Sequence, residues 1–236
     1  MKTLAIEAAC PPGSIAVAEA GRTVCFRQLE DVRRTTQTFA LVISDVLAEA
    51  NWQPHDIELV ATTEGPGSFT GLRIGVTAAK VFAYAVQAKA IGISTLAVIA
   101  RQATTDGELE VVLDAQRGEW FGARFRKQGN VVEQLGPTQI IQIDTWLGTG
   151  LGTGFSPADV IGPGLNKIDA KLREKLSGQK VVIQPEDLWC PRADTLARIA
   201  FELTSSGVET SPWKLKPRYL RRSAAEEKAD GALADS

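Results

Sequence analysis

Residues 64–75 read EGPGSFTGLRIG, a glycine-rich stretch between an apolar run at 57–63 and an amphipathic segment that continues to residue 86. The apolar run, IELVATT, is typical of a buried strand, and the segment after the glycines has the periodicity of a helix. Glycines permit a tight strand-to-helix turn, and the first amides of the helix could bind an anion. However, no lysine is placed to reach a β- or γ-phosphate, and the spacing of the glycines matches neither G-x-x-x-x-G-K nor G-x-G-x-x-G. We therefore favour a structural turn, with phosphate binding as the open alternative.

The second half of the chain repeats the order of strands and helices of the first half in a shorter form. A polar break at 104–108 separates the two versions, and each begins with a three-stranded meander. Strands are expected at 3–9, 14–20, 21–29, 57–63 and 90–95, and again at 111–116, 121–127, 130–135, 159–161 and 181–185. Helices are expected at 35–50, 70–86, 96–103 and 191–207, with a glycine-rich loop at 145–156. The pattern predicts an α/β protein of two related lobes, 1–103 (completed by 190–222) and 104–189.

The C-terminal segment splits into a basic part and an acidic part. Residues 212–222 hold five basic residues and no acid, whereas residues 223–236 hold one lysine against four acids and lack aromatic and β-branched residues. We expect the acidic tail to be disordered. Trp213 and Tyr219 could stack on RNA beside the basic residues. The near-neutral body of the chain favours a solvated basic terminal strand, with at most weak contact to tRNA.

Composition sets the class of protein. The 236 residues carry a formal charge of −2, with 44% hydrophobic and 23% charged residues, which argues against disordered, collagen-like and coiled-coil chains. The three cysteines are widely spaced and predict free thiols in a reducing compartment. No apolar run reaches the length of a membrane span, and Glu7 interrupts the N-terminal run, so we expect no signal peptide, no membrane association and a cytoplasmic location.

The single histidine limits the chemistry. His55 stands between a predicted helix and a predicted strand, where a solvated loop residue is expected. Metal hydrolases generally use two or more imidazoles at helical spacing, so catalysis by a histidine pair is excluded. Sites made only of carboxylates, such as those for magnesium, are not excluded by this count.

Two acidic segments are candidates for a site. Glu7 ends the first strand and could hold a magnesium–phosphate complex, but Ala8 and Ala9 supply no hydroxyl and the two prolines that follow Cys10 supply no N–H. A solvated or ion-paired acid is therefore favoured at this position. The hairpin DAQRGEWF (114–121) carries two acids and an arginine that could form a polar cluster at a lobe interface, although exposed turn chemistry is favoured. These residues are Asp114, Arg117 and Glu119.

Several of these segments together resemble the TsaB (YeaZ) family. They are GPGSFTGLRIG (65–75), LAIEAAC (4–10), SIAVA (14–18), DAQRGEWFGARF (114–125) and PRYLR (217–221), so the resemblance runs from Leu4 to Arg222. It implies two actin-like (RNase H-like, ASKHA) lobes, each a mixed β-sheet with flanking helices. It also implies a non-catalytic partner or activator of a TsaD-type transferase, which forms threonylcarbamoyladenosine next to the tRNA anticodon.

The same resemblance implies the partners and the missing chemistry. The implied partners are a TsaD-like catalytic paralogue and a TsaE-like ATPase, with a homodimer when the chain is alone. The paralogue's metal site uses a histidine pair, which this chain lacks, so no catalytic residue, no metal and no cofactor is expected here. The alternatives are an actin-like ATPase or phosphotransferase that uses Glu7 and the glycine loops, and a glycoprotease-like peptidase.

The sequence also departs from the family pattern at three places. Glu7, Ala8 and Ala9 replace the usual Asp-Thr-Ser of the opening loop, Arg34, Thr35 and Thr36 stand where the first helix usually has a histidine, and Phe121 replaces a tyrosine. These departures weaken the case for nucleotide binding in the first lobe. They leave the fold and the expected pairing surface untouched.

We expect the partner surface on the helices at 35–50 and 70–86. Small residues on the second helix would leave room for a facing helix at about 8 Å, and the alternative is that they pack only against the chain's own sheet. The interface candidates are Phe39, Gly71, Arg73, Gly75, Ala78, Ala79 and Phe82. The turn that sets the exit angle of the second helix consists of Gly65, Pro66, Gly67, Ser68, Phe69 and Thr70.

Overall fold

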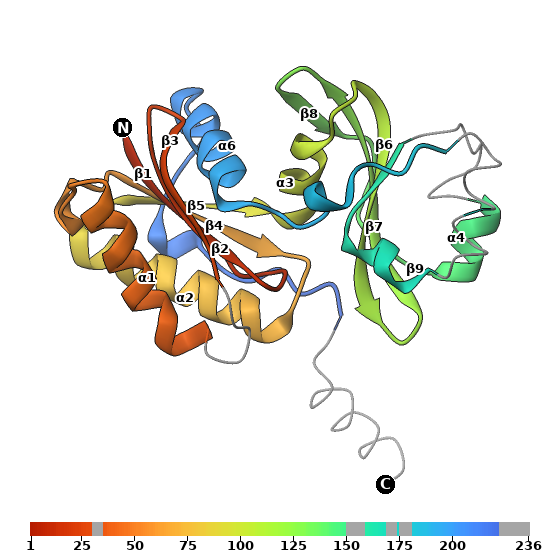
Figure 1. Ribbon diagram of the computed structural model, residues 1–236, viewed down its shortest axis with the longest axis horizontal. Coiled ribbons are helices and arrows are strands. Elements are labelled where there is room, and N and C mark those ends of the chain that lie inside the picture. Colours follow the sequence, from red (N-terminus) through yellow and green to blue (C-terminus); the bar gives the residue numbers. More distant parts are fainter. Residues whose placement is uncertain (30–34, 150–158, 169–173, 175–180, 222–236) are drawn as a thin grey trace, which may run out of the picture.

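The computed structural model describes residues 1–29, 35–149, 159–168, 174 and 181–221. The strands form two five-stranded mixed sheets, one from the first part of the chain and one from the middle (Figure 1). Helix α6 (Ala193–Ser205) returns to the first sheet after the second is complete. Figure 1 shows this arrangement, with α6 beside β2 and β3.

The first sheet has the strand order β3-β2-β1-β4-β5. Its strands are β1 (Lys2–Glu7), β2 (Ser14–Glu19), β3 (Arg22–Gln28), β4 (Leu59–Gly65) and β5 (Lys89–Ser94). The first three strands pair antiparallel as a meander, and β4 and β5 continue the sheet in parallel from β1. Parallel strands need crossover connections, which are supplied here by helices.

Helices cover both faces of the first sheet. On one face lie α1 (Thr35–Glu49) and α2 (Phe69–Val86), and on the other lie α6 and part of α3 (Thr95–Gln102). Alternation along β1 explains the two-sided core, because Leu4 and Ile6 pack with α1 and α2 whereas Ala5 packs with α6. The central strands β1, β2 and β4 are buried on both faces, which is why they are mostly apolar, whereas the edge strand β3 is largely exposed and polar.

The second sheet has the order β10-β6-β7-β8, and β9 pairs with the other end of β7. Its strands are β6 (Gly107–Gln116), β7 (Glu119–Gln128), β8 (Val131–Gln134), β9 (Gln139–Gln142) and β10 (Asp159–Ile161). Trp120 and Trp146 meet edge to face in its core, and the Trp146 indole donates to Glu110 at 2.6 Å. Helix α4 (Ile143–Thr149) carries Trp146 into this core.

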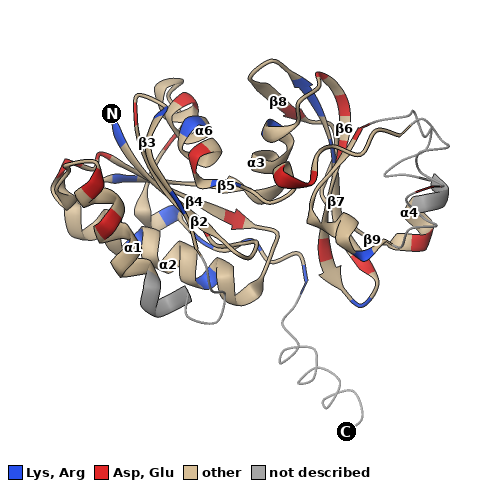
Figure 2. Ribbon diagram, in the orientation of Figure 1, with Lys and Arg blue, Asp and Glu red and all other residues tan. Residues whose placement is uncertain are grey.

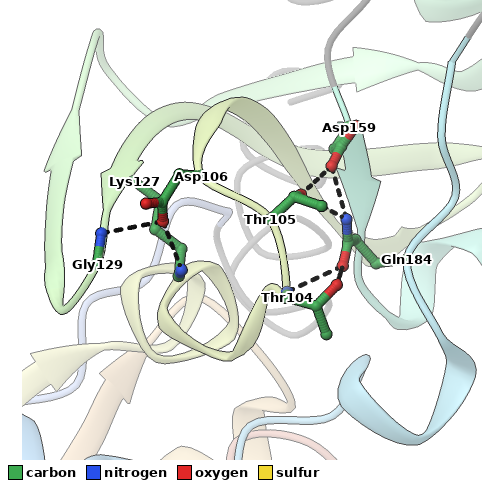
Figure 3. A network of polar contacts seen from close by, with 7 residues as sticks. All are labelled: Thr104, Thr105, Asp106, Lys127, Gly129, Asp159 and Gln184. Carbon is green, nitrogen blue, oxygen red and sulfur yellow. Dashed lines mark hydrogen bonds and ion pairs between the residues drawn. The ribbon is translucent and has the colours of Figure 1, made fainter.

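A polar network fixes the point where the chain crosses from α3 to β6 (Figure 3). The Gln184 side chain accepts from the backbone and hydroxyl of Thr104 and donates to Thr105 and Asp159. Asp106 accepts from Lys127 and from a backbone amide of the β7–β8 turn, so the start of β6 is held from two sides. Buried polar groups with several partners fix one geometry.

Most expected elements are present, and four expectations need correction. Strand β9 was not expected, and residues 145–149 belong to helix α4 rather than to a loop. The expected strand at 181–185 is only a single bridge between Val160 and Ile183. Residues 212–221 contain a short 3-10 turn, Pro212–Lys214, and no strand. The acidic tail at 223–236 and most of the 145–156 loop lie outside the described residues.

Candidate partner surface and inter-sheet cleft

The glycine-rich turn joins β4 to α2 by contacts that need small residues. Gly65 has φ of +125°, in the region that favours glycine, and a Cβ there would stand 2.6 Å from the Arg218 carbonyl oxygen. Ser68 caps α2 by accepting from the Gly71 amide at 3.2 Å. Its own amide donates to the Ala9 carbonyl at 2.8 Å. The turn is thus tied to the loop after β1.

The small residues at the start of α2 face the chain's own first loop. A Cβ on Gly71 would lie 1.9 Å from the Ala8 carbonyl oxygen, and one on Gly75 would lie 3.1 Å from the Ala8 Cβ. Gly75 and Ala79 are buried. Gly71, Gly75 and Ala79 therefore serve the packing of α2 on its own sheet, which is the alternative that the sequence left open for them.

The remaining interface candidates line an outward groove between α1 and α2. Arg73 is exposed, Ala78 and Phe82 are half-buried, and Phe39 closes the floor of the groove. Its volume is about 850 Å³. Its lining is mostly apolar and consists of Phe39, Ala40, Ile43, Ser44, Leu47, Ala48, Trp52, Gln53, Pro54, Arg73, Ile74, Thr77, Ala78, Val81, Phe82 and Ala85.

The outer face of α2 is unusually apolar for a surface helix. Arg73 and Lys80 are its only charged residues, and Figure 2 shows the helix mostly in tan. Val81 and Tyr84 are 62% and 66% exposed, and Trp213, 71% exposed, meets the Tyr84 ring edge to face. Among the described helices α2 alone is long and apolar enough to cross a membrane by length and composition. Its buried residues pack against β1 and β4, as in the core helix of an α/β fold.

A second hollow, of about 840 Å³, lies between the two sheets. The glycine-rich turn and the first loop line one side, and the β6–β7 hairpin and the turn Pro163–Lys167 line the other. The C-terminal residues 218–221 run along it. This size lies within the range of small-molecule sites.

The C-terminal segment connects both sides of this cleft. Tyr219 stacks on Phe69 at 4.4 Å between ring centroids, and its hydroxyl accepts from Arg73 at 3.0 Å. Arg218 pairs with Glu64 at 2.8 Å. Arg221 pairs with Glu119 of β7 and donates to a carbonyl of β6. Most of the polar groups that the sequence offered for RNA in this segment are thus engaged within the chain.

The hairpin acids take part in this junction. Asp114 pairs with Lys167 at 3.4 Å and accepts from a backbone amide of its own turn at 2.9 Å. Glu119 meets Arg221, and Arg117 lines the cleft. The turn chemistry favoured from the sequence is present, but Asp114 and Glu119 are half-buried rather than exposed, and their ion pairs correspond to the alternative of a polar cluster.

The expectation for Glu7 is wrong, because its side chain is fully buried rather than solvated or ion-paired. One carboxylate oxygen accepts from the amides of Ala9 and Cys10, at 2.7 and 3.1 Å, and from the Thr63 hydroxyl at 3.4 Å. The other oxygen has no hydrogen-bond partner among the residues that the structure describes. Burial raises the pKa of Glu7 to about 8, and the backbone hydrogen bonds only partly oppose that effect.

The first loop has few amides left for a phosphate group. The amides of Ala9 and Cys10 donate to Glu7, and Pro11 and Pro12 have no N–H. In the facing turn, the Ser68 amide donates to the Ala9 carbonyl and the Gly71 amide donates to the Ser68 cap. His55 is exposed in the turn Pro54–Asp56, as expected. Among the described residues, no three His, Cys, Asp or Glu side chains gather as a possible metal site.

Comparisons with known proteins agree with this geometry. The family model "TsaD: tRNA N6-adenosine threonylcarbamoyltransferase" matches residues 31–228. The Escherichia coli "tRNA threonylcarbamoyladenosine biosynthesis protein TsaB" is 28% identical over 98% of this chain and 99% of its own length. The Bacillus subtilis protein of the same name is 28% identical over 79% of each chain. The solved structure "YeaZ from Pseudomonas aeruginosa" superposes with a TM-score of 0.76 at 20% identity, over 93% of this chain and 99% of that one.

The chain belongs to the family that this TsaD model describes, and within it to the TsaB (YeaZ) group. Its fold is the expected α/β arrangement with two actin-like mixed sheets and flanking helices. The GPGSFTG turn of this TsaB-like chain is placed as the sequence predicted, between a strand and a helix. Burial of Glu7 was missed, because an acid at a strand end gives no sign of its depth. The proximity of Cys10 and Cys190 was missed too, because they lie 180 residues apart.

Proposed function

We propose that this chain is an accessory subunit that binds and activates a TsaD-type transferase during formation of threonylcarbamoyladenosine next to the tRNA anticodon. The names of the curated relatives place them in this biosynthesis. The observation that carries the proposal is the apolar groove between α1 and α2 with the exposed apolar residues beside it. Exposed apolar patches of this kind mark protein–protein interaction sites.

The partner is a TsaD-like paralogue, because the family model of that transferase matches most of this chain. A related fold offers two equivalent helices, so α1 and α2 can meet their counterparts around a pseudo-twofold axis. When the chain is alone, a second copy takes the same place and gives a homodimer. A TsaE-like ATPase completes the assembly, and contact with tRNA through 212–222 is weak.

We propose no catalytic residue for this chain on its own. The amides of Ala9 and Cys10, which a phosphotransferase would direct at phosphate, are engaged with Glu7, and that of Gly71 is engaged in the helix cap. The size of the inter-sheet cleft keeps a nucleotide-binding, actin-like ATPase as the second candidate. A nucleotide that raises the melting temperature of the isolated protein would favour that second candidate. Nothing at the exposed His55 supports a peptidase.

The groove is tested by Ala78→Arg. Ala78 is half-buried and lines the groove, so an arginine can extend into the groove of the free protein but brings a charge into a desolvated interface. We expect affinity for the TsaD-type paralogue from the same cell to fall at least about tenfold, that is about 1.4 kcal/mol. Titration calorimetry measures the affinity, and tRNA modification with paralogue and ATPase present should fall in parallel.

Val131→Arg is the matched control, because Val131 is 68% exposed on β8 of the other sheet. It should bind the paralogue like the unmodified chain. Equal affinity of Ala78→Arg and the control, with both proteins folded, would assign the partner surface elsewhere. Formation of modified tRNA by the isolated chain would refute the accessory role.

A further inference from the structure

Two cysteines from distant parts of the chain meet beyond the C-terminal end of β1, the central strand of the first sheet. Cys10 follows β1, Cys190 precedes α6, and their sulfur atoms lie 3.7 Å apart although the residues are separated by 180 positions. Both thiols also approach the Pro11 carbonyl, at 3.9 and 3.8 Å. A disulfide needs a sulfur–sulfur distance of about 2 Å. The two sulfur atoms are therefore within reach of a bond after a small movement of the side chains.

The two thiols differ in the way that stepwise oxidation requires. Cys10 is 7% exposed, whereas Cys190 is half-buried and open to a small reagent. The Cys10 thiol donates to the Cys190 sulfur, and this hydrogen bond lowers the pKa of Cys190 while it raises that of Cys10, together with burial. The thiolate is the reactive form of cysteine. Cys190 is therefore the attacking group and Cys10 the resolving one.

The pair also lies at a structural junction. The Cys190 carbonyl accepts from the Gln102 side chain at the end of α3, and the Arg192 amide donates to the same side chain. Cys10 adjoins Ala9, whose carbonyl accepts from Ser68 of the glycine-rich turn. A covalent bond here would fasten the returning chain to the loop that supports α2.

We propose that Cys10 and Cys190 form a reversible dithiol–disulfide site that reacts with small disulfides of the glutathione class. The Cys190 thiolate attacks the reagent disulfide, forms a mixed disulfide and releases one glutathione thiolate, which takes up a proton. The Cys10 sulfur then attacks the Cys190 sulfur, loses its proton and releases the second glutathione. In balance, two protein thiols and one glutathione disulfide give one protein disulfide and two glutathione thiols.

The experiment equilibrates the full chain with glutathione buffers of graded ratio, followed by acid quenching and mass spectrometry. The unmodified chain should lose about 2 Da, the two thiol hydrogens, without a lasting glutathione adduct, and a single linked peptide pair should contain Cys10 and Cys190. Cys25→Ser is the matched control, because Cys25 is a buried cysteine on β3. It should oxidise like the unmodified chain.

The single variants separate the two steps. Cys10→Ser should stop at a glutathione adduct on Cys190, and Cys190→Ser should react at least about tenfold more slowly, because its remaining thiol at this site is buried. Oxidation should also raise the melting temperature of the unmodified chain, since a bond across 180 residues restricts the unfolded state. A lasting adduct on the unmodified chain, or a disulfide that includes Cys25, would overturn the proposal.

Discussion

At the scale of single residues, Glu7 shows how position changes chemistry. The same acid that could hold a metal at an open strand end is here enclosed, with one oxygen on two amides and the other without a partner in the described part of the chain. Desolvation favours the neutral carboxyl, so its pKa rises to about 8. The side chain of Glu7 reaches back to the loop amides and occupies them.

This burial predicts a pH-dependent gain in stability for Glu7→Gln. Below pH 4.5 both folded and unfolded chains hold the proton, and between 4.5 and about 8 only the folded chain does. The free energy of unfolding therefore falls as the pH rises through that window, by an amount on the order of 3 kcal/mol at about pH 7. Glutamine does not ionise, so the free energy of unfolding of Glu7→Gln should increase relative to that of the unmodified chain as the pH rises from about 5 to about 8.

Urea unfolding at about pH 5 and at about pH 8 measures the difference in free energy of unfolding between Glu7→Gln and the unmodified chain. Glu133→Gln is the control, because it makes the same chemical change at a side chain that is 62% exposed on β8. If Glu7→Gln changes stability by the same amount at both pH values, the carboxyl is already ionised in the folded chain and the assignment fails.

At the scale of elements, the sequence predicted most strands and helices but not the direction of the small residues on α2. Periodicity showed that α2 has two faces, and the regular spacing of its glycines was compatible with either face. Only the position of the loop after β1 decides the question, since Ala8 lies directly under Gly71 and Gly75. Long-range proximity of this kind leaves no trace in local sequence. Strand β9 was missed for a similar reason, because its four residues are stabilised by pairing with β7.

Gly71→Ala should therefore destabilise the fold although alanine is the better helix former. Its Cβ would stand 1.9 Å from a backbone oxygen, so α2 or the first loop must move. We expect a loss of about 2–3 kcal/mol in the free energy of unfolding, because overpacking against backbone outweighs the gain of about 1 kcal/mol in helix propensity. Gly136→Ala is the control, since a Cβ there meets nothing within 4 Å. Equal stability of the two variants, measured by urea unfolding, would contradict the close packing.

At the scale of the whole molecule, the basic segment after α6 joins the two sheets. The sequence identified its charge and its aromatic residues but not their partners, because those partners are contributed by β4, α2, β6 and β7. Figure 2 shows blue and red residues interspersed over the second sheet. Arg221 forms an ion pair with Glu119 of β7 in that sheet. A segment whose sequence could indicate an RNA-binding strand thus holds the two sheets together through its own side chains.

Two truncations distinguish this segment from the acidic tail that follows it. Removal of 223–236 should leave the melting temperature unchanged, because the composition of the tail predicts disorder. Removal of 216–236 also deletes the Tyr219–Phe69 stack, leaves the buried Glu64 without Arg218 and breaks the Glu119–Arg221 ion pair. We expect a loss of at least about 2 kcal/mol, or a melting temperature lower by roughly 4–8 °C.

Leu215 is the reason for cutting at residue 216, because this side chain is 4% exposed in the core of the first sheet and stays in both truncated chains. Any difference between the chains therefore comes from residues 216–222 and not from a hole in the core. Tyr219→Ala in the full chain should reproduce part of the loss of stability, since it removes the stack on Phe69 but keeps the ion pairs of Arg218 and Arg221. If both truncations melt together with the full chain, the segment does not fasten the sheets, and its arginines become available to bind RNA.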